Sequence, residues 1–156
     1  MEERQQHDSG NNKVKILIVD DHSIVRRGLA QLINQEPDFV VCMEAGSAME
    51  ALAAMKEQSF DLAVVDISLD DINGIQLTEK IYSLFPKLPV LILTMHNEVV
   101  YAERALRAGA AGYVTKNEAA EKIITAIRQV LSGKEYISEK VIRNSSGEPH
   151  VQERCS

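Results

Sequence analysis

The chain has 156 residues, a length that suits one domain, and 45% of them are hydrophobic, which is enough for a core of its own. A formal net charge of −6 argues against broad binding to nucleic-acid phosphates. The two cysteines lie far apart and predict neither a disulfide framework nor a zinc site. The polar N-terminus lacks the apolar core of a secretory signal, and no run approaches the roughly 20 apolar residues that cross a bilayer. We therefore expect a cytoplasmic protein with no membrane partner.

Strands and helices are predicted to alternate along the chain. Short β-branched and aliphatic runs predict five buried strands, at residues 15–20, 39–46, 61–66, 89–94 and 111–115. Helical spacing of apolar residues follows each strand, in the segments 22–35, 47–58, 74–85, 98–109 and 118–133. Strict alternation predicts a doubly wound α/β fold, with helices on both faces of a parallel five-stranded sheet and right-handed crossovers.

The apolar positions of the first two helices predict which side chains enter the core. The expected stripes are Ile24, Val25, Leu29, Leu32 and Ile33 in the first, and Met49, Leu52 and Met55 in the second, after Ser47 as N-cap. The methionines in general are expected in the core. Residues 1–12 and 136–156 are polar and unpatterned, so we expect flexible tails around one domain at 13–135, the second being a tail or a truncated linker.

Chemically active side chains stand where the predicted strands end. Asp20 and Asp21 end the first strand, Asp66 the third and Thr94 the fourth, and Lys116 follows the fifth. In an open parallel sheet the functional site lies beyond the carboxyl ends of the strands. We therefore expect these five side chains to meet at one edge.

The residue types at this edge favour phosphoryl transfer. Three crowded carboxylates repel one another unless a cation is present, and Mg²⁺ accepts carboxylate oxygens while retaining waters and phosphate oxygens. Lys116 can neutralise part of an incoming phosphoryl group, and the Thr94 hydroxyl can donate to one of its oxygens. An Asp beside such groups can attack phosphorus and form an acyl phosphate.

The same residues, together with the motifs "DISLDDING" and "ALRAGAAGYVTK", closely resemble the receiver domain of bacterial two-component response regulators. The resemblance runs from about Lys13 to about Gly133. The stretch "LTMHNEVVYAERALRAGAAGYVTK" further resembles receivers that usually precede a LuxR-type helix-turn-helix. It implies the flavodoxin-like strand order 2-1-3-4-5.

The resemblance assigns roles to individual residues. It implies that Asp66 accepts a phosphoryl group from a sensor histidine kinase, with Thr94 and Lys116 contacting that group. It also implies a Mg²⁺ site made by Asp20, Asp21, Asp66 and the backbone carbonyl of Ser68. Tyr113 is expected to turn inward from a more exposed rotamer on activation.

The resemblance further implies a phosphoacceptor signalling domain, one that catalyses only its own phosphorylation and dephosphorylation and is not otherwise an enzyme. The phosphorylated form is expected to expose a surface for homodimerisation or output, with transcription regulation as the role of the full-length protein. Direct DNA binding by this chain is not expected, because no helix-turn-helix follows residue 133.

The sequence departs from the family pattern at two positions near the predicted site. Asp70 stands where the family commonly has Pro, and Asn117 follows Lys116 where many relatives have Pro, which makes a cis peptide there less secure. Asp70 and Asp71 are expected in a solvated turn. Two positions are open to His22, the edge of the site and solvent in the first helical turn, and the second is expected; His96 is expected to affect access at most.

Residues at particular positions argue against other kinds of functional site. An EF-hand beginning at Asp66 has Asp71 where Gly is needed and Leu77 where Glu is needed. Glycine-rich nucleotide-binding motifs do not follow the first strand, and Asp20 and Asp21 would repel a flavin phosphate there. A haloacid-dehalogenase-like hydrolase would need an Asp where Ser68 stands. A binding module of receiver fold that is not phosphorylated is the remaining alternative, although such modules usually lack one of the reactive residues.

Overall fold

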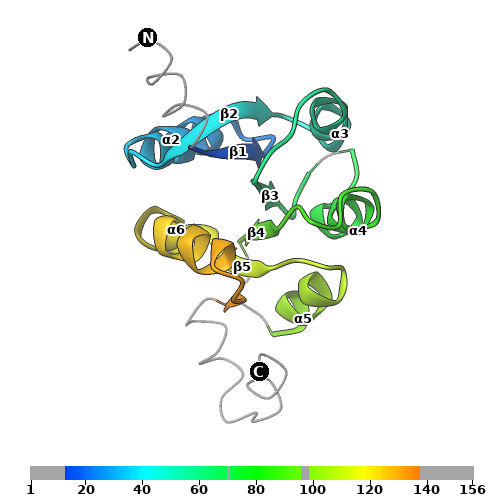
Figure 1. Cartoon of the computed structure of the whole chain (residues 1–156). Helices are drawn as coiled ribbons and strands as arrows, with labels where there is room; N and C mark the ends of the chain where they lie inside the picture. The colour runs from blue at the N-terminus through cyan, green and yellow to red at the C-terminus, as the bar shows by residue number, and fades with distance from the viewer. Residues whose placement is uncertain (1–12, 70, 96–98, 138–156) are drawn as a thin grey trace.

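Six parallel strands form the central sheet of the computed structural model, which describes residues 13–69, 71–95 and 99–137 (Figure 1). Their order is β2-β1-β3-β4-β5-β6, so the predicted order 2-1-3-4-5 is confirmed and one strand is added at the edge. The strands are β1 (Val14–Val19), β2 (Phe39–Ala45), β3 (Leu62–Asp66), β4 (Val90–Thr94), β5 (Gly112–Thr115) and β6 (Tyr136–Ile137).

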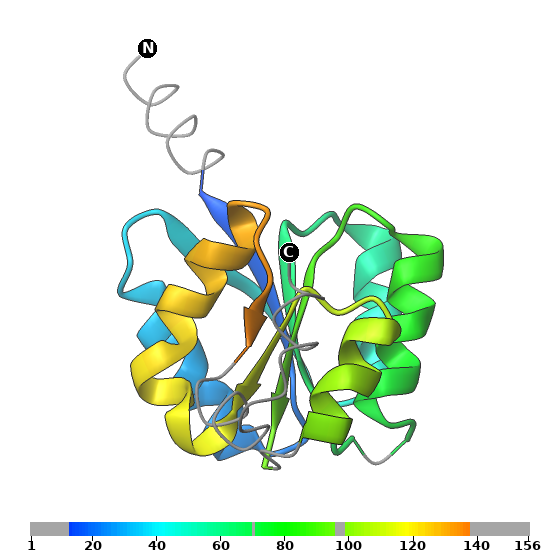
Figure 2. The same ribbon diagram turned by 90° about the horizontal axis from the view of Figure 1, so that it is seen from below.

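Helices cover both faces of the sheet, as the alternating pattern predicts. They are α2 (Ser23–Asn34), α3 (Ala48–Glu57), α4 (Gly74–Leu84), α5 (Val99–Arg107) and α6 (Lys116–Leu131). Figure 2 shows α2 and α6 on one side of the strands and α3, α4 and α5 on the other. None of these helices is long and apolar enough to span a bilayer.

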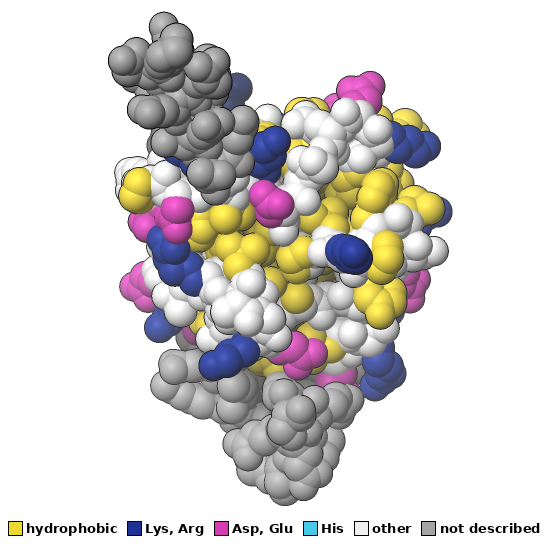
Figure 3. All heavy atoms as spheres, viewed as in Figure 1, with side chains coloured by type: hydrophobic (Ala, Val, Ile, Leu, Met, Phe, Trp, Pro, Cys, Tyr) yellow, Lys and Arg dark blue, Asp and Glu magenta, His cyan; other side chains and the backbone are white. Residues whose placement is uncertain are grey.

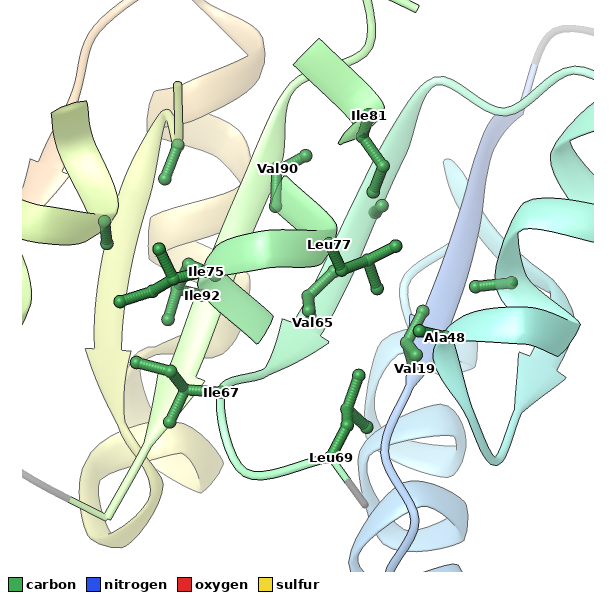
Figure 4. Close-up of a cluster of buried hydrophobic side chains, with 14 of the residues drawn as sticks. Val19, Ala48, Val65, Ile67, Leu69, Ile75, Leu77, Ile81, Val90 and Ile92 are labelled. Carbon is green, nitrogen blue, oxygen red and sulfur yellow. The ribbon is translucent and has the colours of Figure 1, made fainter. Parts of the chain in front are cut away.

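The strands are apolar on both sides because each face of the sheet carries its own core. Along β1, Ile16 and Ile18 belong to the cluster under α2 and α6, whereas Leu17 and Val19 belong to the cluster under α3, α4 and α5. All four side chains are 0% exposed. Figure 4 shows the second cluster, in which Val19, Val65 and Ile92 of neighbouring strands meet residues of α4. Burial on both faces explains the continuous apolar runs in the sequence.

The first turns of α2 and α3 depart from the predicted stripes. Leu29, Ile33 and Met55 are buried as expected, but Ile24 is 86% exposed and Met49 74% exposed. Val25 is also exposed, and so is Met95 after β4. These residues lie at or beyond the carboxyl edge of the sheet, where no strand remains to cover them. In α3 the buried positions are mostly alanines, Ala48, Ala51 and Ala54, which apolar spacing of large side chains does not reveal.

The N-terminus of α3 is capped as predicted. The Ser47 hydroxyl accepts a hydrogen bond from the Glu50 N–H at 3.1 Å. The Glu50 carboxylate in turn accepts one from the Gly46 N–H at 2.7 Å. Two donors that the helix itself leaves unpaired are thereby satisfied.

Strand β6 places two residues of the expected C-terminal tail in the sheet. Tyr136 and Ile137 pair with Gly112 and Tyr113 of β5, and the Tyr136 N–H donates to the Ala111 carbonyl at 3.2 Å. Their half-buried side chains pack on opposite faces of the sheet, one against each core cluster. A strand of two residues is too short for a periodic pattern, so the sequence did not predict it. The expectations for 1–12, 138–156, Asp70 and His96 lie outside the described residues.

Candidate functional site

The carboxyl ends of four adjacent strands bring the predicted reactive side chains to one edge. Asp20 follows β1, Asp66 ends β3 and Thr94 ends β4, and all three residues are 0% exposed. Lys116 is the first residue of α6, directly after β5, and its side chain is 10% exposed. Asp66 is in register with Leu93, the neighbour of Thr94.

Lys116 pairs with the two buried carboxylates. Its Nζ lies 3.1 Å from Asp66 Oδ2 and 3.4 Å from Asp20 Oδ2. The other oxygen of Asp66, Oδ1, accepts a hydrogen bond from the Ser68 N–H at 3.1 Å. The acceptor carboxylate is therefore oriented from both sides, by an ammonium and by the loop that follows it. The peptide bond after Lys116 is trans.

The environment of Asp66 disfavours its charge. Burial raises the pKa of its carboxyl group above the ordinary value of 3.8, and the neighbouring charge of Asp20 acts in the same direction. The Ser68 N–H and the Lys116 ammonium lower that pKa and partly offset the burial. One ammonium thus compensates incompletely for the buried carboxylates.

The residues present fit a divalent cation. Asp20, Asp21, His22 and Asp66 each offer one ligand atom, and these atoms all lie within 4.8 Å of one another. Asp20 Oδ2 is buried and, among the described residues, accepts no hydrogen bond. A buried carboxylate oxygen without a donor is costly unless a cation compensates for it. The donor set is dominated by oxygen, as a hard cation requires.

His22 is closer to this site than the sequence predicted. Its ring is 59% exposed, yet Nδ1 lies 3.2 Å from Asp20 Oδ1 and 3.2 Å from Asp21 Oδ1. The backbone N–H of His22 also donates to Asp20 Oδ1, at 2.8 Å. The side chain is exposed, as expected, but it also contacts the acidic pair. Its place directly after the acidic pair is the one signal that the sequence offered.

Arg26 is a second residue that the sequence analysis missed. Its guanidinium donates to the Asp20 backbone carbonyl at 2.6 Å and to the Glu44 carboxylate at 3.1 Å. Arg26 thereby joins the end of β1 to β2 from its place on α2. Nothing in the spacing of charges along the chain indicates this contact.

Asp71 is exposed in a bend, as expected, but it also has a structural role. Its carboxylate accepts hydrogen bonds from the N–H groups of Ala48 and Met49, at 3.1 and 3.0 Å, and so caps α3 from the loop after β3. Desolvation raises the pKa of Asp71, but hydrogen bonds from the N–H groups of Ala48, Met49, Ile72 and Asp71 itself together outweigh it and hold the pKa below the ordinary value of 3.8. The sequence analysis missed this cap because the capped helix is 22 residues away in the sequence.

The sequence profile of the response regulator receiver domain matches residues 16–128. The chain belongs to the response regulator receiver domain family. The receiver aligns with curated transcription regulators over most of its length, but it spans little more than half of theirs.

Two relatives illustrate the range. The transcriptional regulatory protein DegU of Brevibacillus brevis is 32% identical over 85% of this chain and 56% of its own. The DNA-binding transcriptional activator DevR/DosR of Mycobacterium tuberculosis is 39% identical over 81% of this chain and 58% of its own.

Solved structures agree with the fold and the subfamily. A LuxR-family response regulator from Aurantimonas is 35% identical and superimposes with a TM-score of 0.83, covering 88% of this receiver and 98% of that chain. The isolated receiver of RcsB from Salmonella enterica, determined with the phosphomimetic BeF₃⁻, is 26% identical with a TM-score of 0.79, covering 85% of this receiver and 99% of that chain. The resemblance to LuxR-type receivers is confirmed.

Tyr113 occupies an inward position in this receiver. It is 0% exposed, belongs to the core under α3, α4 and α5, and stands in register between Ile92 and Ile137. The sequence analysis expected a more exposed rotamer before phosphorylation. The buried ring corresponds to the inward position that the sequence analysis expects on activation.

An apolar groove lies at the opposite edge of the sheet from the acidic site. It is lined by the ends of α3 and α4 and the loops after them, including Met55, Phe60, Phe85 and Leu88. Figure 3 shows apolar side chains gathered on the face where Figure 1 places these two helices. The groove contains none of the reactive residues and takes no part in the chemistry described above.

Proposed function

We propose that this receiver accepts a phosphoryl group on Asp66 from the phosphohistidine of a sensor histidine kinase. The observation that carries the proposal is the buried Asp66 carboxylate at the end of β3, held between the Lys116 ammonium and the Ser68 N–H. A carboxylate in this setting is desolvated and oriented, and both conditions favour its use as a nucleophile.

The transfer exchanges one bond at phosphorus for another. A carboxylate oxygen of Asp66 attacks phosphorus while the bond from phosphorus to the kinase imidazole nitrogen breaks. That nitrogen keeps the electron pair of the broken bond, and Asp66 becomes an acyl phosphate. Lys116, already 3.1 Å from Asp66 Oδ2, is placed to pair with an oxygen of the arriving group. The Thr94 hydroxyl is proposed to donate to another.

Mg²⁺ is the cation that we propose for this site. Asp20, Asp21, Asp66 and the Ser68 carbonyl would hold it. When bound, Mg²⁺ would supply positive charge to the phosphoryl oxygens and to the crowded carboxylates. Two observations support this requirement for a cation: Asp20 Oδ2 accepts no hydrogen bond from a described residue, and the pKa of Asp66 is raised.

The proposed consequence is a change of surface. Phosphorylation would alter the face formed by α5, β5 and α6, where a second copy of the receiver or an output domain can bind. The relative DevR/DosR is named as a DNA-binding activator, and we propose transcription regulation for the full-length protein, with DNA bound by its output domain. Kinase and receiver must share a compartment, which we propose is the cytoplasm. The domain itself is proposed to span 13–137, which extends the expected boundary by β6.

Intact-mass spectrometry after treatment with acetyl phosphate tests the proposal. The wild type should gain one phosphoryl group in Mg²⁺ and none in EDTA, and Asp66→Asn should gain none. Asp20→Ala and Asp21→Ala should be labelled much more slowly. Asp61→Asn, on an exposed Asp before β3 at the opposite edge, is the matched control and should behave as wild type. Undiminished labelling of Asp66→Asn would overturn the assignment, and an unlabelled wild type would favour the non-phosphorylated binding module.

A further inference from the structure

The imidazole of His22 lies against the carboxylates that are proposed to hold the metal. Its Nδ1 is 3.2 Å from Asp20 Oδ1, 3.2 Å from Asp21 Oδ1 and 3.7 Å from Asp66 Oδ2. Three oxygens from two different strand ends therefore surround one ring nitrogen. The Lys116 Nζ also lies 3.5 Å from this nitrogen, and the His22 side chain is 59% exposed.

These separations suit ligands of a single ion. In octahedral geometry, with ligands at about 2.1 Å, neighbouring ligand atoms are separated by about 3 Å. The distances from Nδ1 to Asp20 and Asp21 are close to that value, and the distance to Asp66 is slightly longer. The distance from Nδ1 to each oxygen is therefore close to the distance between neighbouring ligand atoms of one ion.

A second observation concerns a buried carboxylate oxygen of Asp20. Asp20 is 0% exposed, and its Oδ2 accepts no hydrogen bond from any residue that the structure describes. Lys116 Nζ is 3.4 Å from this oxygen but also serves Asp66. One ammonium is shared between two buried carboxylates, and an additional positive charge would stabilise both.

We propose that His22 Nδ1 is a metal ligand of this receiver and that it makes the site prefer first-row transition ions to Mg²⁺. The inference rests on the proposed metal site, although not on phosphorylation of Asp66. Mg²⁺ is a hard ion that takes oxygen ligands, so it gains little from an imidazole. Mn²⁺, Co²⁺ and Zn²⁺ accept imidazole nitrogen together with carboxylate oxygen, and they gain from it.

The opposite role for His22 makes a different prediction. If the ring served only as a hydrogen-bond donor to Asp20 and Asp21, a bound cation would displace it. Removing the ring would then leave the affinity for every divalent ion unchanged or higher. The comparison of two ions in the same variants separates these roles.

Calorimetric titration with Mg²⁺ and with Co²⁺ provides the test, at one fixed pH. The full chain carries His7→Gln, His96→Gln and His150→Gln throughout, so that His22 is its single imidazole. Replacing His22 by Phe or by Ala should weaken Co²⁺ binding about tenfold or more while changing Mg²⁺ affinity less than about threefold. Asp21→Ala is the matched control and should weaken both ions. Circular dichroism checks that each variant is folded.

The ¹⁵N resonances of the His22 ring give an independent readout. Addition of Zn²⁺ should shift Nδ1 far more than Nε2, and Mg²⁺ should leave both nearly unchanged. Co²⁺ affinity that is absent, or that does not fall when His22 is replaced, would overturn the inference. Failure of Mg²⁺ to bind any of the proteins would instead count against the proposed function, so the two failures are distinguishable.

Discussion

At the scale of single residues, Lys116 determines how much negative charge the end of β3 can carry. Its ammonium pairs with Asp66 and Asp20, and the side chain is 10% exposed, so little water screens the interaction. The same ammonium would also repel a divalent cation at the site. Lys116 therefore opposes metal binding while favouring the phosphorylated state.

Lys116→Ala separates these two effects. The variant should bind Mg²⁺ no more weakly than wild type, because a nearby positive charge is removed, and it should be phosphorylated more slowly by acetyl phosphate. Metal titration and intact-mass kinetics measure the two quantities. Lys134→Ala, an exposed lysine after α6, is the control and should change neither. A large loss of Mg²⁺ affinity in Lys116→Ala would contradict the charge argument.

Asp71 joins the loop after the acceptor to α3, so its loss should destabilise the fold. Asp71→Ala leaves two N–H groups of the first turn unpaired, and such caps contribute about 1 kcal/mol. Because the folded state lowers the pKa of Asp71 below 3.8, the contribution should be constant above that pH and vanish as the pH falls through the folded pKa.

Urea unfolding of wild type and Asp71→Ala over a pH series checks this dependence. The difference in the free energy of unfolding should stay level from neutral pH down to mildly acidic pH and shrink only at lower pH. A difference that grows with acidity would show that Asp71 does not act through its charge.

At the scale of elements, the packing of α4 against β3 shapes the acceptor loop. A Cβ atom on Gly74 would lie 2.5 Å from the Asp66 carbonyl oxygen and 2.6 Å from the Ile67 Cα. The Gly74 N–H donates to the Ile67 carbonyl at 2.8 Å. The first residue of α4 thus approaches the acceptor backbone more closely than any other residue type allows.

Gly74→Ala should therefore destabilise the receiver and disturb its chemistry. Because backbone rather than a flexible side chain would have to move, we expect a loss of about 1–3 kcal/mol and slower phosphorylation of Asp66. Gly28→Ala, in the middle of α2, is the control: a Cβ there meets nothing within 4 Å, and we expect about 0.5–1 kcal/mol of stabilisation. Chemical unfolding and labelling kinetics measure both. Normal stability and labelling in Gly74→Ala would show that the loop adapts without cost.

At the scale of the whole molecule, Tyr113 belongs to the core beside the surface that is proposed to change. Its ring is 0% exposed, and its neighbour in β6 is Ile137. In a two-state equilibrium, phosphorylation of Asp66 would raise the population of the state with the inward ring, to the extent that the phosphoryl group stabilises that state more than the other.

Thr94 is the residue through which we expect this shift to occur. Thr94→Ala should still accept a phosphoryl group, because the nucleophile and Lys116 remain, but it should respond weakly. Backbone NMR spectra with and without beryllofluoride should show shifts across α5, β5 and α6 in wild type and fewer in the variant. If wild-type shifts stay confined to the Asp66 loop, the switch mechanism is lost while the phosphoacceptor assignment stands.

Much of the fold followed from local patterns. Alternating apolar runs and amphipathic segments predicted every strand from β1 to β5 and every helix described. Strands buried on both faces leave continuous apolar runs, whereas helices buried on one face leave apolar residues at helical spacing. The end of each strand then predicted that Asp20, Asp66, Thr94 and Lys116 meet at one edge, since parallel strands share their direction.

Other features were decided by the tertiary structure alone, because each of them depends on contacts between residues distant in the sequence. Ile24 and Met49 are exposed because the sheet ends beneath them. Asp71 caps α3, a helix that precedes it in the sequence by more than 20 residues. The ring of His22 contacts carboxylates that follow or end two different strands. Tyr113 pairs in the sheet with a strand of only two residues. The periodicity of apolar residues predicts which side chains are buried. Which polar side chains then contact one another is determined only when the helices and strands pack together.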